Sequence, residues 1–320
     1  MKMRNKFIIA ACCLCMAFIS KAQEYTIYNQ YHFHYYLLNP ALAGAEPCTH
    51  FMLTHKQQWI GLKDAPNTQI LSFQTRTKAN VGIGGYLFND KNGYSYQQGG
   101  QLTAAYHIPM SRGNRYSRKQ SLDRQLSFGV SVKFYRYQLD QDVVDYANLD
   151  GENIQRKDGT YPNANFGIFY QSYKFFTGVS VTNLVPVDID MFGETEPQRP
   201  FSTMLQMGYA FDGGRDLQLE PSVVFKMDEN SRKQMDLAFR VIQHLDADDV
   251  SWWAGVIMKQ NLDEGSGQSL VLLPNATVRI GKFRVGYAFN LDLNKMISQN
   301  YGTHEIMIGY SFCKARRFCR

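Results

Sequence analysis

The chain has 320 residues, of which 14% are aromatic, and a formal net charge of +6 at pH 7. Lys2, Arg4, Lys6 and Lys21 lie at the N-terminus, so removing these four from +6 leaves +2 and no indication of nucleic-acid binding. No apolar run after residue 22 approaches the roughly 18 residues of a membrane-spanning helix, which excludes a helical membrane protein.

The N-terminus has the pattern of a secretory signal peptide. A basic stretch from Lys2 to Lys6 precedes the apolar run 7–19, and Ser20-Lys21-Ala22 supplies a cleavage site. A lipoprotein box ending at Cys12 is the alternative. Only five apolar residues precede this cysteine, fewer than the roughly 7 to 15 of a signal core. We therefore predict an exported protein that is cleaved after Ala22.

Apolar and polar residues alternate with a period of two along most of the remaining chain. In one segment Phe283, Val285 and Tyr287 alternate with Arg284 and Gly286. This spacing is typical of a strand with one apolar and one polar face. Fourteen segments follow the pattern, at residues 49–59, 67–77, 81–90, 96–108, 122–136, 163–171, 173–183, 201–211, 216–226, 234–244, 250–260, 268–280, 282–291 and 303–312.

The alternation predicts an all-β fold, a transmembrane antiparallel up-and-down barrel of about 14 strands. A soluble barrel or sandwich would have its apolar face inside. So many strands enclose a lumen too wide to be filled by the polar-face residues, many of which are Gly, Ser or Ala. Turning the apolar face toward lipid and the polar face toward a wet lumen removes this difficulty.

The connections between the segments also indicate an outer-membrane barrel. Even-numbered connections are tight, the odd-numbered ones are longer, and residues 109–121 are an exception. Outer-membrane barrels have short periplasmic turns and long surface loops. We expect a signal peptide at 1–22, a periplasmic N-terminal segment at 23–48, a barrel at 49–312 and a basic tail at 313–320, with both termini in the periplasm.

Basic residues gather on the side predicted to face the periplasm, whereas the two longest predicted surface loops are acidic. One interpretation is that these are simply solvent-exposed charged residues. The sharper hypothesis is a patch that docks an acidic periplasmic partner or anionic lipid headgroups. The patch comprises Arg112, Arg115, Arg118, Lys119, Arg124, Lys314, Arg316, Arg317 and Arg320.

Three cysteines remain after the predicted cleavage site. Cys48 precedes the first predicted strand and Cys313 follows the last. A closed barrel pairs its first and last strands, so these two residues should lie close together in a compartment that permits disulfides. We predict a Cys48–Cys313 bridge, with Cys319 as the alternative partner.

Catalytic and metal-binding motifs are missing from the sequence. The glycine-rich stretch 81–85 lies in a predicted strand and opens no helix, so it is not a phosphate loop. His50 and His55 fall on opposite faces of one predicted strand, an arrangement that is unfavourable for a shared metal. We expect no enzymatic activity, no metal and no cofactor. Charged residues that face the lumen should form a salt-bridged interior or a channel lining; they are Glu220, Arg240, Arg279, Arg284 and Glu305.

Three stretches carry a family resemblance. They are Tyr-Asn-Gln-Tyr at 28–31 with Leu-Asn-Pro-Ala-Leu-Ala-Gly at 38–44, Gln-Gln-Trp-Ile-Gly at 57–61 with Ala-Pro-Asn-Thr at 65–68, and Val-Gly-Ile-Gly at 81–84 with Asn-Asp-Lys-Asn-Gly at 89–93. Together they resemble the PorP/SprF family of Bacteroidetes outer-membrane proteins. The family usually has an arginine before its Gln-Trp, where this chain has Lys56-Gln57. The matching positions, our candidates for partner contact, are Gln30, Tyr31, Asn39, Pro40, Ala41, Gly44, Gln58, Trp59, Gly61, Pro66, Thr68, Asn89, Asp90 and Gly93.

The resemblance implies a component of the type IX secretion system in the cell outer membrane. Such a protein supports the export or surface anchoring of proteins with C-terminal sorting domains. Its implied partners are outer-membrane lipid, periplasmic ring components of the system and secreted cargo, with no role for nucleic acid. A diffusion channel for small solutes is the alternative function, because a barrel of this size can leave an aqueous path.

Residues 39–44 allow two interpretations. Their turn-forming and small residues favour a tight turn that leads into the first strand. The alternative is that this segment plugs the lumen or contacts a partner, together with the aromatic residues upstream, which are Tyr31, Phe33, Tyr35 and Tyr36.

Overall fold

The computed structural model describes residues 31–77, 80–110, 124–140, 158–185, 201–214, 216–245, 250–262, 270–292 and 301–313. The predicted signal peptide and the C-terminal tail from residue 314 onward lie outside the described residues. Within them, no helix is long and apolar enough to cross a membrane.

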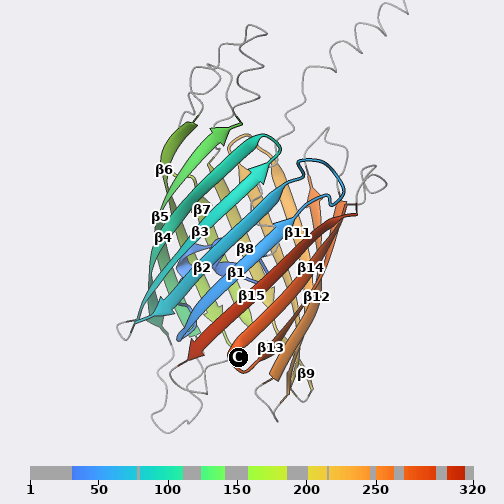
Figure 1. Cartoon of the computed structure of the whole chain (residues 1–320). Coiled ribbons are helices and arrows are strands. Elements are labelled where there is room, and N and C mark those ends of the chain that lie inside the picture. The colour runs from blue at the N-terminus through green and yellow to red at the C-terminus, as the bar shows by residue number, and fades with distance from the viewer. Residues whose placement is uncertain are drawn as a thin grey trace, which may run out of the picture.

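The described chain folds into a closed antiparallel β-barrel (Figure 1). Neighbouring strands pair in chain order, β1 pairs with β15, and β10 pairs with both β8 and β11. The elements are η2 (Tyr35–Leu37), η3 (Pro40–Leu42), β1 (Cys48–Gln57), β2 (Asn67–Arg76), β3 (Val81–Asn92), β4 (Ser95–Pro109), β5 (Arg124–Leu139), β6 (Asp158–Ser172), β7 (Phe175–Thr182), β8 (Ser202–Tyr209), β9 (Phe211–Gly214), β10 (Leu217–Asp228), β11 (Lys233–Leu245), β12 (Val250–Asn261), β13 (Leu270–Ile280), β14 (Phe283–Asp292) and β15 (Thr303–Cys313).

The barrel has the fourteen strands that the sequence predicts. The short β9 continues β8 after a break at Ala210, and both pair with the same edge of β10. Ala210 itself stays attached to the neighbouring turn, because its N–H donates to the Lys174 carbonyl oxygen at 2.6 Å. β8 and β9 therefore occupy one place in the ring.

The outer surface of the barrel is apolar and its inner surface polar. Along β4 and β5, Leu102 is 75% exposed whereas Ser127 is fully buried. The same alternation runs through β1, where Phe51 and Leu53 are exposed and Met52 and Thr54 are buried. Apolar side chains that point outward suit lipid, and polar side chains that point inward suit a lumen, which confirms the predicted fold.

The two ends of the barrel differ. The end that carries Cys48 and Cys313, called here the short-turn end, has two-residue connections between β6 and β7 and between β13 and β14. The opposite loop end carries residues 58–66. The expectation that all odd-numbered connections are long is wrong for β3–β4, where Gly93 and Tyr94 are the whole connection. Gly93 adopts a φ of +59°, and this left-handed conformation permits so tight a turn.

Candidate functional site

The segment from Tyr31 to Ala45, called here the lumen segment, lies inside the barrel and contacts its wall on three sides. Tyr36 packs with residues of β2 to β6. Tyr31 and Leu38 pack with Val224, Ala238 and other residues of β10 to β13. Phe33 packs with residues of β1, β14 and β15. Aromatic side chains thus fix the segment across the width of the lumen.

Asn39 is the central polar residue of the lumen segment. Its side-chain oxygen accepts a hydrogen bond from the Ala41 N–H at 2.9 Å and caps the short helix η3. Its amide nitrogen donates to the carbonyl oxygens of Ile168 and Val179, on β6 and β7, at 3.2 and 3.4 Å. Pro40 follows at the first helical position, where the missing N–H costs nothing. The sequence Asn-Pro-Ala therefore forms a turn and also attaches it to the wall.

Glycines on the inner face of the barrel make room for this turn. A Cβ at Gly82 would lie 1.8 Å from the Ala43 carbonyl oxygen, and one at Gly129 would lie 2.3 Å from the Pro40 carbonyl carbon. A Cβ at Gly167 would lie 2.0 Å from the Asn39 side-chain oxygen. Glycine inside a strand often marks the close approach of another backbone. The wall is therefore shaped to hold residues 39–43.

Polar side chains of the wall bind the backbone of the lumen segment at further points. The His107 ring donates from Nε2 to the Ala43 carbonyl oxygen at 2.9 Å. The Ser180 hydroxyl donates to the Leu38 carbonyl oxygen at 2.7 Å. The Gln74 side-chain oxygen accepts the Gly44 N–H at 3.2 Å. Buried backbone groups of a non-regular segment need such partners, and the lumen wall supplies them.

His34 is held as a neutral imidazole. The Gln74 amide donates from its nitrogen to His34 Nε2 at 3.3 Å, because its oxygen is occupied by Gly44. His34 Nδ1 then carries the proton and can donate to the Ser72 hydroxyl at 3.2 Å. Burial, with His50 and Arg284 nearby, lowers the pKa of His34 to about 3. Burial also places the pKa of His32 well below its usual value.

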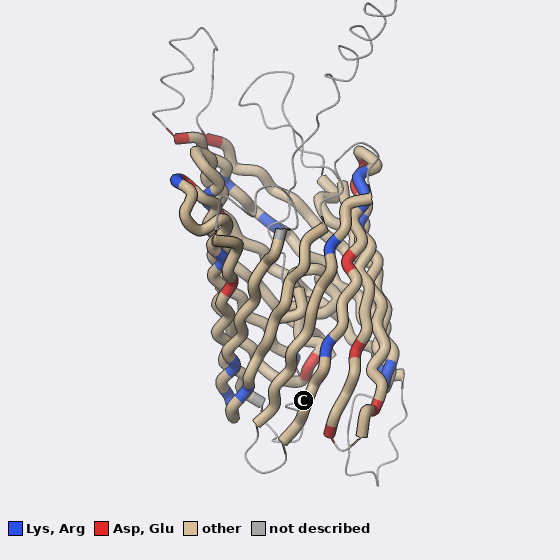
Figure 2. Tube along the Cα trace, turned by 90° about the vertical axis from the view of Figure 1, so that its right-hand side faces the viewer, with Lys and Arg blue, Asp and Glu red and all other residues tan. Residues whose placement is uncertain are grey.

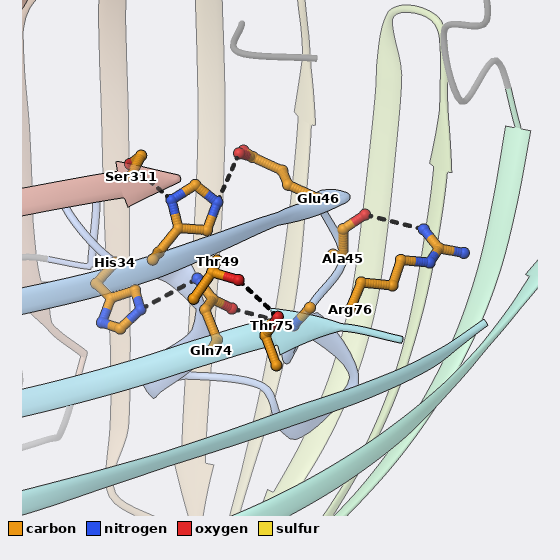
Figure 3. A network of polar contacts seen from close by, with 10 residues as sticks. His34, Ala45, Glu46, Thr49, Gln74, Thr75, Arg76 and Ser311 are labelled. Carbon is orange, nitrogen blue, oxygen red and sulfur yellow. Dashed lines mark hydrogen bonds and ion pairs between the residues drawn. The ribbon is translucent and has the colours of Figure 1, made fainter. Parts of the chain in front are cut away.

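A polar network surrounds the point where the segment leaves the lumen at the short-turn end (Figure 3). Arg76 on β2 donates to the Ala45 carbonyl oxygen at 3.3 Å. His50 on β1 contacts the Glu46 carboxylate at 3.1 Å from one ring nitrogen and the Ser311 hydroxyl at 2.8 Å from the other. These contacts join residues 45 and 46 to the first two strands of the ring, and His50 also links the first strand to the last.

Charged residues are spread along the height of the barrel (Figure 2), and several of them are buried on its inner face. Arg240 on β11 forms an ion pair with Glu220 on β10, and its guanidinium lies against the rings of Tyr35 and Trp253. Lys56 and Glu305 are directly opposite each other on β1 and β15, and both are buried. The predicted salt-bridged interior is therefore present for Glu220 and Arg240.

The family-motif residues divide between two places. Tyr31, Asn39, Pro40, Ala41 and Gly44 lie in the lumen segment, and Gln30 lies outside the described residues. The others lie at the loop end or in the strands leading to it. They are Gln58, Trp59, Gly61, Pro66, Thr68, Asn89, Asp90 and Gly93.

At the loop end, the family-motif residues stabilise the local backbone. The Thr68 hydroxyl donates to the Asp90 carboxylate across β2 and β3, and the Pro66 carbonyl oxygen accepts the Gln58 N–H at 2.8 Å. Trp59 and Gly61 have φ values of 44° and 101°. Between them, Ile60 exchanges backbone hydrogen bonds with Tyr301 and Gly302, which closes the β1–β15 seam at this end.

At the short-turn end, Cys48 is disulfide-bonded and faces Cys313 across the β1–β15 ladder. This register supports the predicted bridge, while Cys319 lies outside the described residues. Of the predicted basic patch, Arg124 is described and exposed at the start of β5. The other residues of the patch lie outside the described ranges. In the part of the chain that is described, no three His, Cys, Asp or Glu residues form a possible metal site.

Sequence reasoning missed the wall residues that hold the lumen segment. Gly82 and Gly129 both fall on the polar face of a predicted strand, where a glycine has no side chain to present. A glycine on the polar face of a strand is the feature of the sequence that could have indicated these contacts, because strand glycines often mark the close approach of another backbone. His107, Gln74 and Arg76 carry no such signal, since many polar residues face the lumen.

Comparison with known proteins agrees with this architecture. A family model described as type IX secretion system membrane protein PorP/SprF matches residues 20–310. No curated protein matches the chain. Among solved structures, the CymD monoaromatic hydrocarbon channel is similar at 13% identity with a TM-score of 0.51, over 90% of this chain and 92% of that one. The Ralstonia pickettii toluene transporter TbuX is similar at 12% identity with a TM-score of 0.51, over 87% of this chain and 92% of that one.

Proposed function

Since the chain belongs to the PorP/SprF family of type IX secretion system membrane proteins, we propose that it works in the outer membrane as a plugged component of this system. In this role it supports the secretion or surface anchoring of proteins with C-terminal sorting domains. The observation that carries the proposal is the seating of residues 39–44, which carry the family resemblance, on inward-facing glycines of the barrel.

The plug interpretation follows from the packing of the lumen segment. Tyr31, Phe33 and Tyr36 contact different sectors of the wall, so the segment crosses the lumen. Buried Lys56 and Glu305 occupy the lumen face on the loop-end side. A plugged barrel suits a docking component, which needs a stable surface on each side of the membrane and no open pore.

The proposed orientation places the short-turn end in the periplasm. Outer-membrane barrels have short turns on that side and longer loops outside. The lumen segment emerges next to Glu46 at the short-turn end. The start of β1 and the end of β15 lie at the same end of the barrel. Periplasmic ring components would then meet the turns, and secreted cargo would meet the loop end.

A diffusion channel is the second candidate function. It is supported by the fold shared with CymD and TbuX, which are described as a channel and a transporter. The lumen segment weighs against it, because the segment lies in the path that a solute would take. It is held there by hydrogen bonds, by packing of its aromatic rings and by its close fit against glycines of the wall. We therefore place the secretion role first.

The test is a comparison of the surface and culture-fluid proteomes of a deletion strain, its parent and the complemented strain. The proposal predicts selective loss of proteins with type IX sorting domains, restored by the wild-type gene, while other outer-membrane proteins stay unchanged. Normal export of those proteins in the deletion strain would show that this member does not serve secretion or anchoring.

A further inference from the structure

The outer surface of β1–β6 changes from apolar to polar at one boundary near the loop end. The outward-facing apolar side chains below it, called here the apolar belt, end in a row that includes Leu53, Leu71 and Leu87, which are Cα partners in turn and exposed. The next outward-facing row toward the loop end is polar on all six strands. Its members are partners from strand to strand: His55, Gln69, Asn89, Gln98, Arg136 and Thr160.

Five side-chain amides at this boundary are joined by hydrogen bonds into a row called here the amide ladder. Each bond runs from a side-chain nitrogen to a side-chain oxygen. Gln98 donates to Asn89 at 2.9 Å, and Asn89 donates to Gln69 at 3.3 Å. Gln69 donates to Asn67 at 3.1 Å, and Asn67 donates to Gln57 at 2.6 Å. The ladder thus holds its side chains in place across β1–β4, and such preorganisation favours the binding of a ligand.

The amides of the ladder can make further hydrogen bonds. A side-chain amide has two N–H donors and an oxygen with two lone pairs. Within the ladder, Asn89 uses one of its donors and one of its lone pairs, and both of these bonds are exposed. Each hydroxyl group of a sugar is likewise both a donor and an acceptor. A row of exposed amides therefore matches the polar edge of a saccharide.

Charged and aromatic side chains border the amide ladder on its loop-end side. Lys91 pairs with Asp64 at 3.5 Å, and its amine lies 5.5 Å from the centre of the Tyr96 ring. Arg136 pairs with Asp158 on the neighbouring strand. Because a carboxylate balances each of these cations, the face as a whole does not select anions. An aromatic ring beside amides suits a sugar, which has an apolar C–H face and hydroxyl edges.

The amide ladder lies where the barrel leaves the lipid at the loop end. A transmembrane strand needs about 9–11 residues. β1 and β2 have 10 residues each, whereas β4, β5 and β6 have 15, 16 and 15. At the loop end, β5 and β6 extend beyond β14 and β15 (Figure 1). The wall that carries the ladder therefore continues from the apolar belt into the layer of lipid headgroups.

We propose that the amide ladder is a docking surface for the core sugars of lipopolysaccharide in the outer leaflet of the outer membrane. The ladder directly adjoins the apolar belt, so a lipid whose acyl chains lie against Leu53 and Leu71 brings its sugars to the ladder. A protein partner would need an apolar centre to its interface, which the polar rows do not offer. The inference goes beyond the secretion role and rests on the proposed orientation, in which the loop end faces outward.

The test compares the binding of two fluorescein-labelled glycolipids by the full-length protein in detergent micelles. Rough lipopolysaccharide carries core sugars, and lipid A has the acyl chains and phosphates without them. The wild type should bind rough lipopolysaccharide at least about tenfold more tightly than lipid A, because only the former reaches the amides. Gln69→Ala/Gln98→Ala removes both ladder neighbours of Asn89 and should reduce the preference to less than about twofold.

The matched control is Gln243→Ala/Gln260→Ala on β11 and β12. Gln243 is opposite exposed Trp252, and Gln260 shares a face of β12 with exposed Val256, so both amides point outward. They lie outside the ladder, and this variant should keep the preference of the wild type. Migration in unheated gels shows whether each variant is folded. Asn89→Ala, a single change in the ladder, should also lower the preference and keeps the proposal testable if the double variant fails to fold.

Three results of these titrations would overturn the proposal. The first is equal affinity of the wild type for rough lipopolysaccharide and lipid A, which would leave contacts with acyl chains and phosphates only. The second is an unchanged preference in the folded ladder variants, or an equal loss in the control variant. The third is displacement of rough lipopolysaccharide by free core oligosaccharide as readily as by the unlabelled glycolipid, which would indicate a site for soluble sugars.

A protein occupant is tested on intact cells. Tyr94 is 56% exposed in the turn between β3 and β4, so Tyr94→Cys can carry a benzophenone maleimide near the ladder without changing its amides. Irradiation should give adducts that contain lipopolysaccharide, and a reproducible protein adduct without lipopolysaccharide would overturn the proposal. None of these results bears on the secretion role, because the proteome of the deletion strain tests that role without these variants.

Discussion

The Cα of Gly82 lies so close to the carbonyl oxygen of Ala43 that a Cβ at position 82 would be 1.8 Å from that oxygen. This relationship joins a strand of the barrel wall to the C-terminal part of the lumen segment. His107 reinforces the contact by donating to the same oxygen. The wall and the lumen segment therefore fit as one packed unit.

We expect Gly82→Ala to displace the lumen segment while the barrel remains folded. The new methyl group meets backbone atoms that cannot move aside without breaking the His107 bond. Chymotrypsin should then cleave between Tyr31 and Tyr36, which are buried in the wild type. The control is Gly309→Ala at an inward-facing glycine, where a Cβ would make only ordinary van der Waals contacts at 3.4 Å or more, and this variant should stay resistant. Equal resistance of both variants would show that the segment is not held by this contact.

Replacement of Asn39 should destabilise the protein more than replacement of another family-motif asparagine. Asn39→Ala removes the cap of η3 and two hydrogen bonds to the wall. We expect a loss of about 2 kcal/mol in the free energy of unfolding. Asn89→Ala removes bonds that are exposed and should cost less than about 0.5 kcal/mol. Urea unfolding in lipid vesicles measures both, and equal losses would contradict the role given to Asn39.

Acidification should loosen the lumen segment through His34. The pKa of His34 is about 3 in the folded protein, below its ordinary value of 6.5. Protonation therefore favours the unfolded or displaced segment, and stability that is complete above pH 6.5 is lost as the pH falls toward 3. At pH 5.5 the expected loss is about 1.4 kcal/mol.

The matched variant for this pH effect is His34→Gln, which cannot titrate. Its stability should change less between pH 7.5 and pH 5.5 than that of the wild type, when both are followed by urea unfolding. His32 contributes in the same direction, because burial lowers its pKa as well. An identical pH profile for His34→Gln would show that this imidazole does not set the response.

The disulfide of Cys48 should link the first and last strands. Non-reducing peptide mapping is expected to recover Cys48 with Cys313, its Cα partner across the ladder. Cys313→Ser should lower the unfolding free energy by about 3 kcal/mol, a typical cost of losing a bridge, and Cys319→Ser should have no effect. Recovery of a Cys48–Cys319 peptide would contradict this pairing.

The strands could be predicted from the sequence because the environment imposes the pattern. Lipid on one side and a polar lumen on the other force alternation along every strand, as Leu102 and Ser127 illustrate. The short strand β9 could not be predicted, because its pairing with β10, which has a register shift between Leu217 and Gln218, is a property of two strands and not of one segment. Because neighbouring strands pair in chain order and the barrel closes, the sequence also predicts that Cys48 lies opposite Cys313, which is the register of the structure.

The lumen segment was the harder part to predict. Asn39 and Pro40 indicate a turn, and the structure contains that turn as η3. The location of the turn depends on glycines and polar residues from several strands. No local sequence pattern predicts which strands of the wall a turn will contact. The aromatic residues upstream are the local feature that favours a buried segment, and Tyr31, Phe33 and Tyr36 pack against the wall of the barrel.

Ion conductance across planar bilayers tests most directly whether the lumen segment closes the barrel. The purified wild-type protein should give no steady conductance, and Gly82→Ala should open a measurable path, because only the variant displaces the segment. Gly309→Ala should behave like the wild type. Steady conductance of the wild type at the level of Gly82→Ala would contradict the plugged barrel and favour the diffusion channel.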